Sequence, residues 1–235
     1  MSAKGRSQAR TRLEARSAES NPVRQKITVL VSDRGSNLRA LLETRDLGGD
    51  IVRVIANRAD AGGLAIAASH GVATSVVEHR AFASRADFDA ALAAAIDVDG
   101  PDLVVLAGFM RVLGAAFIAR YAGRMINIHP SLLPAYPGLH THRRALADGV
   151  RIHGCTVHFV TPEVDVGPIV AQGAVPVRDG DDEDALAARV LAVEHILLPR
   201  VVRWYCEGRL VVEGRRVHIR DLDTPGGGKM VSPGE

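Results

Sequence analysis

The sequence predicts an α/β fold: a doubly wound, mostly parallel sheet with a small antiparallel part near the C-terminus. Two observations carry this prediction. From residue 27 to residue 129, short segments rich in Val, Ile and Leu alternate with Ala-rich helical segments, which is typical of parallel strands joined by right-handed crossover helices. After residue 150, two apolar segments follow each other closely enough to pair antiparallel.

The first half of the chain contains five expected strands and four expected helices. The strands are short apolar runs, and the helices repeat Ala or Leu on one face. The expected strands are 27–32, 51–57, 73–78, 102–107 and 125–129, and the expected helices are 37–45, 63–70, 84–96 and about 114–121.

The second half changes its pattern after residue 129. Three prolines, Pro130, Pro134 and Pro137, prevent a helix or a central strand from following at once. A long helix is expected to begin in an acidic run, which suits a helix N-terminus. The expected elements are helix 140–148, strands 154–160 and 169–177, helix 182–206, and a terminal hairpin formed by 209–212 and 216–219.

Composition places the chain among ordinary soluble globular proteins. The net charge is +2, with 26 Arg and 3 Lys, so no polyanionic partner such as nucleic acid is expected. Two cysteines, Cys155 and Cys206, fit neither a disulfide framework nor a zinc site, and they favour the reducing cytoplasm. No apolar run approaches the roughly 18 residues of a membrane span. We expect a cytoplasmic protein without a membrane or metal partner.

The organisation predicted along the chain is one domain between two tails. Residues 1–26 carry seven basic and two acidic residues with little apolar content, and they are expected to be disordered. Residues 222–235 are rich in Gly and Pro, which predicts a flexible tail. The domain is expected at 27–221, with halves 27–125 and 126–221.

A first candidate site lies between the first strand and the first helix, at Ser32-Asp33-Arg34-Gly35-Ser36-Asn37. A glycine turn, a hydroxyl and a helix N-terminus suit one phosphate group. The motif matches neither the nucleotide-binding P-loop nor the dinucleotide fingerprint, which disfavours a nicotinamide dehydrogenase. A plain turn with Ser36 or Asn37 as an N-cap explains these residues equally well.

A second candidate site is Asn127-Ile128-His129, at the C-terminal end of an expected buried strand. In open α/β sheets, ligands bind beyond the carboxyl ends of the strands. Asn127 and His129 share one face of the strand because their spacing is i and i+2. An imidazole can move a proton near neutral pH and an amide N–H can stabilise an oxyanion, so this pair predicts catalysis.

Two further loops carry candidate residues. In Thr161–Pro168, a carboxylate could reach a histidine on another strand end and orient it, but the local sequence does not distinguish Asp165 from Glu163. In Ala107–Leu113, a glycine and apolar side chains could hold a flat heterocycle, although core packing explains Phe109, Val112 and Leu113 equally well. His140 and His142 lack the i, i+4 spacing of a helical zinc site.

Taken in order, these four segments closely resemble the folate-dependent glycinamide ribonucleotide formyltransferases. The resemblance runs from about residue 27 to residue 210. Its most specific part is the run Asn-Ile-His-Pro-Ser-Leu-Leu-Pro at 127–134, continued by Tyr-Pro-Gly-Leu-His-Thr-His at 136–142. Segments 102–113, 157–168 and 193–195 with Pro199 support it.

The resemblance implies formyl transfer from 10-formyltetrahydrofolate to the amine of glycinamide ribonucleotide, with small molecules as partners and a homodimer as an open alternative. The implied catalytic residues are Asn127, His129 and Asp165, where the carboxylate would favour the protonated form of His129. The implied ribonucleotide-binding residues are Gly35, Ser36, Asn37 and Glu194. The implied folate-binding residues are Arg85, Met110, Arg111, Val112, Leu113, Asn127, Thr161, Pro162, Glu163, Val164 and Asp165.

The sequence departs from the family pattern at a few positions. Asp33 and Arg34 replace the first glycine of the phosphate loop and its neighbour, which puts a negative charge near the expected phosphate for Arg34 to offset. Val166 stands where many relatives have a small residue. Leu191 occupies a position that is polar in some relatives.

Three other functions stay open on the sequence. Methionyl-tRNA formyltransferase and formyltetrahydrofolate hydrolase share the Asn-x-His and Asp pattern, but the first carries an extra C-terminal domain and the second an extra N-terminal one. A non-catalytic nucleotide-binding module is the third, with the basic tail touching RNA.

Overall fold

The structure is a computed structural model that describes residues 24–221. The tails predicted at 1–26 and 222–235 lie outside the described residues, except for Arg24, Gln25 and Lys26. Of these three, Gln25 and Lys26 already belong to the first strand. Among the described helices, none is long and apolar enough to cross a membrane.

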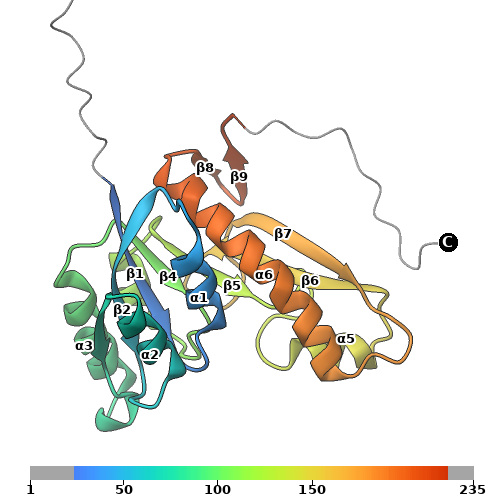
Figure 1. Cartoon of the computed structure of the whole chain (residues 1–235), viewed down its shortest axis with the longest axis horizontal. Helices are drawn as coiled ribbons and strands as arrows, with labels where there is room; N and C mark the ends of the chain where they lie inside the picture. The colour runs from blue at the N-terminus through green and yellow to red at the C-terminus, as the bar shows by residue number, and fades with distance from the viewer. Residues whose placement is uncertain (1–23, 222–235) are drawn as a thin grey trace, which may run out of the picture.

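Within the described residues the chain forms one nine-stranded sheet, in the order β3-β2-β1-β4-β5-β6-β7-β9-β8 (Figure 1). The strands β1 to β5 are parallel to one another. The chain leaves β1 toward β2 on one side and returns to β4 on the other, so the strand order reverses between β1 and β4. The strands are β1 (Gln25–Val31), β2 (Gly49–Ala56), β3 (Ala73–Val76), β4 (Leu103–Leu106), β5 (Met125–His129), β6 (Ile152–Phe159), β7 (Ile169–Pro176), β8 (Leu210–Glu213) and β9 (Arg216–Ile219).

The central strands are apolar at successive positions because both faces of the sheet are covered. In β4, Leu103 and Val105 contribute to the core on one face, and Val104 and Leu106 contribute to the core on the other. This alternation explains why the sequence shows a continuous apolar run here and no alternation with polar residues.

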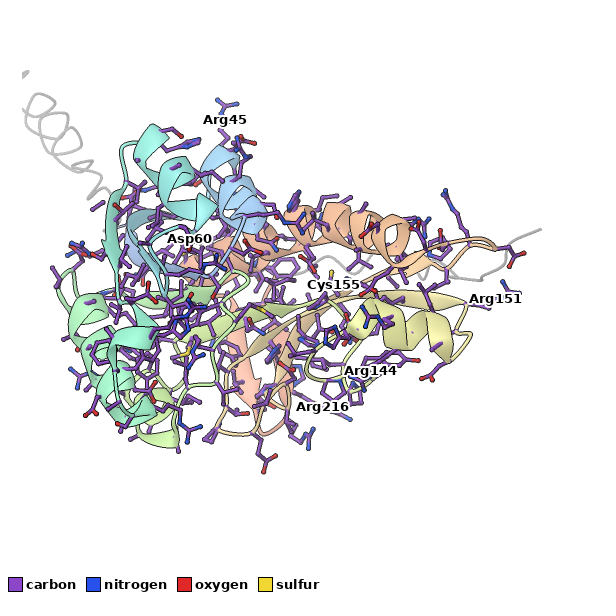
Figure 2. All side chains as sticks on the ribbon, turned by 90° about the horizontal axis from the view of Figure 1, so that it is seen from below. Arg45, Asp60, Arg144, Arg151, Cys155 and Arg216 are labelled. Atoms are coloured by element: carbon purple, nitrogen blue, oxygen red, sulfur yellow. The ribbon has the colours of Figure 1, made fainter. Side chains whose placement is uncertain are left out.

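Helices cover the two faces unequally. The core on one face includes residues of α1 (Ser36–Glu43), α2 (Gly62–Ser69) and the long α6 (Glu183–Cys206), which crosses the sheet diagonally in Figure 1. The core on the other face includes residues of α3 (Arg85–Asp97) and α4 (Ala115–Arg120). Figure 2 shows Cys155 of β6 between the sheet and α6. The α3 and α4 core draws its strand residues from the β1–β5 half of the sheet.

The antiparallel part is built as predicted. Strand β6 pairs antiparallel with both β5 and β7, and β8 with β9 forms the terminal hairpin. Helix α5 (Thr141–Ala147) precedes β6. Asp182 caps α6 by accepting a 2.8 Å hydrogen bond from the Ala185 amide, which confirms the acidic start expected for this helix. Both predicted halves of the domain contribute strands to the one sheet.

The third strand is shorter than predicted. It ends at Val76, and a 3₁₀ turn follows at His79–Ala81. The Val77 and His79 amides donate to the carbonyls of Ala56 and Asn57 at the end of β2, so the chain bends around that end. The sequence pattern of a four-residue strand is too short to show where this bend begins, because the bend depends on contacts with β2.

Helix α6 provides a test of the core. Leu198 is fully buried against the sheet, whereas Ile196 on the same helix is 60% exposed. We expect Leu198→Ala to lower the free energy of unfolding by about 2–5 kcal/mol, because it removes buried methyl groups and leaves a cavity. Urea unfolding measures this, with Ile196→Ala as the control, expected to change it by less than about 0.5 kcal/mol. Equal losses in the two variants would contradict the packing described.

Candidate active site

The site begins at the carboxyl end of β5. Ile126 and Ile128 belong to the core on the α6 side of the sheet. Asn127 and His129 therefore point to the opposite face, since side chains alternate along a strand. His129 is only 6% exposed. Both predicted catalytic residues of β5 thus lie on one face, as their spacing indicates.

The antiparallel neighbour β6 brings two further polar side chains to this face. In the β5–β6 register, Asn127 pairs with His158 and His129 pairs with Thr156. Cys155, Val157 and Phe159 alternate with them and face α6. His158 is a site residue that the sequence reasoning missed. Its i+2 spacing from Thr156 indicates that the two side chains share one face of β6. That spacing points to the site only when the register of β6 with β5 is known.

The imidazole of His129 is held between two acceptors. Its Nε2 lies 3.0 Å from the Tyr136 carbonyl oxygen, and its Nδ1 lies 3.4 Å from Asp165 Oδ2. A carbonyl and a carboxylate can only accept hydrogen bonds from nitrogen donors. Nε2 therefore donates to the Tyr136 carbonyl, and Nδ1 lies at ion-pair distance from the Asp165 carboxylate.

Asp165 is the carboxylate of the β6–β7 loop that faces inward. Its side chain is 9% exposed, whereas Glu163 is exposed to solvent. The Gly138 amide donates a 2.8 Å hydrogen bond to Asp165 Oδ2, and Asp165 has a φ of 58°. Asp tolerates this left-handed conformation better than most residues. The structure thus decides between the two carboxylates that the sequence left open.

The segment after β5 is strained and firmly anchored. Tyr136 and His140 in this segment, and Asp165 in the facing β6–β7 loop, are three of the four non-glycine residues with positive φ among residues 24–221. Thr156 of β6 fixes the segment, because its Oγ1 donates to the Ser131 carbonyl at 2.7 Å and accepts from the Leu133 amide at 3.0 Å. Strained residues gather where neighbouring structure determines the backbone, as at functional sites.

Two more histidines lie behind His129. The rings of His142 and His153 meet edge to face with centroids 5.3 Å apart. Burial lowers the pKa of His142, and burial together with the nearby His142 lowers the pKa of His153 to about 4. Across residues 24–221, no group of three or more His, Cys, Asp or Glu side chains is arranged to hold a metal ion.

The predicted phosphate loop has an open helix N-terminus. Gly35, with φ of 77°, is the N-cap of α1, and no described side chain caps this helix. The expectation that Ser36 or Asn37 serves as the N-cap is therefore wrong. A Cβ on Gly35 would lie 2.6 Å from the Cα of Gly63, so the close packing of this loop on α2 requires glycine. The first-turn N–H groups of α1 stay available for an anion.

Asn37 and Glu194 are brought together from opposite ends of the chain. The Asn37 Nδ2 donates a 2.7 Å hydrogen bond to Glu194 Oε2 where α1 packs on α6. Burial raises the pKa of Glu194, and the hydrogen bond from Asn37 partly opposes this. Leu191 lies one turn before Glu194 on the same helix and is half-buried. Because the two side chains are in contact, Glu194 and Asn37 can both bind the same ligand.

The loop after β4 forms an exposed ledge beside the end of β1. The Met110 amide donates a 2.7 Å hydrogen bond to Ser32 Oγ, across the point where strand order reverses. Met110 is 61% exposed and Val112 is 56% exposed, while Phe109 and Leu113 are buried. The interpretation that these apolar side chains pack in the core is therefore confirmed for Phe109 and Leu113, and it is wrong for Val112.

Two arginines lie near this ledge. The Arg111 guanidinium stands 5.9 Å from the ring centroid of Phe88, in the first turn of α3. Arg85 is the first residue of α3 and is exposed. Thr161, Pro162 and Val164 lie on the half-buried to exposed loop that carries Asp165.

Comparison with known proteins identifies the family. The formyl transferase family matches residues 25–202. The chain belongs to the formyl transferase family. This match covers the sheet from β1 to β7 and most of α6.

Individual relatives agree with that assignment. The phosphoribosylglycinamide formyltransferase of Escherichia coli is 51% identical over 78% of this chain and 88% of its own length. The human trifunctional purine biosynthetic protein adenosine-3 is 42% identical over 78% of this chain, but the match spans only 18% of that longer protein. The crystal structure of glycinamide ribonucleotide transformylase 1 from Symbiobacterium toebii matches with a TM-score of 0.82 and 48% identity, over 85% of this chain and 96% of that one. The predicted fold class is confirmed by this likeness.

The buried histidine pair predicts a dependence of stability on pH. The pKa of His153 is about 4 in the folded chain, and an unfolded histidine has a pKa of about 6.5. Between these values the unfolded chain binds more protons, so the free energy of unfolding falls as the pH falls. We expect His153→Phe to make this fall shallower, measured by urea unfolding from pH 7.5 to 4.5. Above pH 7.5 the two proteins should run parallel, and an unchanged slope below it would contradict the burial effect.

The loop carboxylates predict a difference between two neighbouring substitutions. We expect Asp165→Asn to lower kcat for formyl transfer by about 10²-fold, because His129 loses its charged partner. Asn also tolerates positive φ and can accept from the Gly138 amide, so the loop should keep its shape. Glu163→Gln, in the same loop but exposed, is the control and should keep kcat within about two-fold. Similar rates for the two variants would rule out this role for Asp165.

Proposed function

We propose that this protein transfers the formyl group of 10-formyltetrahydrofolate to the amino group of glycinamide ribonucleotide. The observation that carries the proposal is the group formed by an amide, an imidazole and a buried carboxylate at the end of β5. Asn127 and His129 share one face of the strand, and Asp165 Oδ2 lies 3.4 Å from His129 Nδ1. Formyltetrahydrofolate is the co-substrate that the formyl transferase family uses.

The reaction needs donors where negative charge develops. When the substrate amine attacks the formyl carbon, the carbonyl oxygen becomes an oxyanion. Asn127 Nδ2 is one donor for this oxygen. His129 Nδ1 is the other, because Nε2 of the same ring faces the Tyr136 carbonyl. The Asp165 carboxylate, 3.4 Å from Nδ1, stabilises the positive charge on the ring. As the carbon–nitrogen bond to the folate breaks, the folate nitrogen takes up a proton and the substrate amine loses one.

The ribonucleotide seat is proposed at α1 and α6. The amides of Gly35, Ser36 and Asn37 lie at the uncapped start of α1, where the helix dipole favours a phosphate. Glu194, hydrogen-bonded to Asn37, is placed to accept from ribose hydroxyls. Asp33 is exposed, and its carbonyl accepts a 3.2 Å hydrogen bond from the Gly63 amide. Its charge therefore lies in solvent, where salt and water screen it.

The folate seat is proposed along the ledge that follows β4. Met110, Arg111, Val112 and Leu113 present backbone groups and apolar surface for the pterin ring, and the 161–165 loop borders it. Arg85 and Arg111 are the cations for the glutamate carboxylates of the folate. Aromatic ligands favour such apolar walls with a few polar backbone groups.

The catalytic role is tested by removing each donor. We expect Asn127→Ala and His129→Ala each to lower kcat by about 10²–10³-fold with the fold intact, because each removes one oxyanion donor. The assay follows the absorbance change of 10-formyltetrahydrofolate, with and without glycinamide ribonucleotide. Circular dichroism of each variant reports on the fold.

The same assay separates the alternatives. Near-normal turnover by purified His129→Ala would refute the catalytic assignment. Folate consumption without the ribonucleotide would indicate a hydrolase. Nucleotide binding that ignores His129 and gives no absorbance change would indicate a non-catalytic module.

A further inference from the structure

We propose that His158 is a positioning residue that sets which end of the Asn127 amide faces the reacting formyl oxygen. The inference deepens the proposed function and rests on it. His158 pairs directly with Asn127 across β5 and β6, and it lies between Asn127 and Asp165.

One ring nitrogen of His158 has its role determined by the backbone. Nδ1 lies 2.9 Å from the Phe159 carbonyl oxygen, which can only accept, so Nδ1 carries a proton. The residue is 2% exposed, and burial lowers its pKa and favours the neutral ring. In a neutral ring with a protonated Nδ1, Nε2 is an acceptor.

That acceptor determines the orientation of Asn127. Nε2 lies 3.2 Å from Asn127 Nδ2, so the amide donates one N–H to His158. The second N–H of the same nitrogen remains for an oxyanion. With the amide rotated by 180°, the Asn127 oxygen would face the Nε2 lone pair, and the site would present an acceptor to a developing negative charge. The neutral tautomer of His158 excludes that orientation.

Because the His158 ring is neutral, it does not compete with His129 for the Asp165 carboxylate. His158 Nε2 lies 3.7 Å from Asp165 Oδ1, beyond hydrogen-bond distance, while the other carboxylate oxygen is 3.4 Å from His129 Nδ1. A charged His158 would compete for Asp165 and would repel the Asn127 N–H group. A buried neutral histidine avoids both effects, and this gives a reason for a second histidine beside the first.

Two amide substitutions separate positioning from packing in the full chain. His158→Gln carries its terminal amide at the depth of Nε2 and can accept from Asn127. His158→Asn reaches only the depth of Nδ1, so it can keep the Phe159 contact but lacks that acceptor. We expect His158→Asn to lower kcat by about 10–100-fold with KM for both substrates nearly unchanged, as for other residues that orient a catalytic group. His158→Gln should keep kcat within about five-fold, which a requirement for imidazole packing alone would not allow.

A double-mutant cycle with Asn127→Ala supplies the decisive readout. If His158 acts through Asn127, His158→Asn causes little further loss once Asn127 is alanine. A full additional loss in that background, equal kcat for the Gln and Asn variants, or a change confined to KM would overturn the inference. His153→Phe, at another buried histidine of β6, is the packing control and should keep kcat within about five-fold. Absence of formyl transfer by the unmodified protein would instead refute the proposed function, so the two failures are distinguishable.

Discussion

The antiparallel pairing of β5 with β6 is the constraint on which the site depends. It sets Asn127 against His158 and His129 against Thr156. A shift of one residue would exchange the two faces of the strand and carry the polar side chains into the α6 core. The opposite face of the sheet fixes this register. On that face Ile126 and Ile128 of β5, with the apolar residues of β6 that alternate with Thr156 and His158, are buried beneath α6. Burial of apolar side chains on one face therefore positions the polar side chains on the other.

The change from parallel to antiparallel strands also shapes the surroundings of the site. Helices α3 and α4 contribute to the core beside β1 to β5. Beyond β5 the polar face meets loops: the 130–140 segment supplies the Tyr136 carbonyl, and the 160–168 loop supplies Asp165. These loops bury His129, His158 and Asp165 together. Charges and hydrogen bonds act more strongly in such a desolvated place than in water.

The parallel half of the sheet contributes a different part of the site. The loops that follow β1 and β4 meet where the strand order reverses, and the Met110 amide joins them through Ser32. Ligand sites in doubly wound sheets lie at such a point. The departure at Asp33 leaves this geometry in place, because Gly35 keeps the close approach to Gly63 and the side chain of Asp33 faces solvent.

The sequence by itself determined the α/β class, the order of elements and the strand-end location of Asn127 and His129. These follow from periodicity and from the alternation of side chains along a strand, which are local properties. Only the tertiary structure decided that Asp165 and not Glu163 turns inward, that His158 joins the site, that Val112 is exposed and that Gly35 caps α1. Each of the first three depends on contacts between residues far apart in the chain. The position of Gly35 as N-cap depends on its left-handed backbone conformation and on its close packing against α2. A local pattern carries no information about which distant groups will meet.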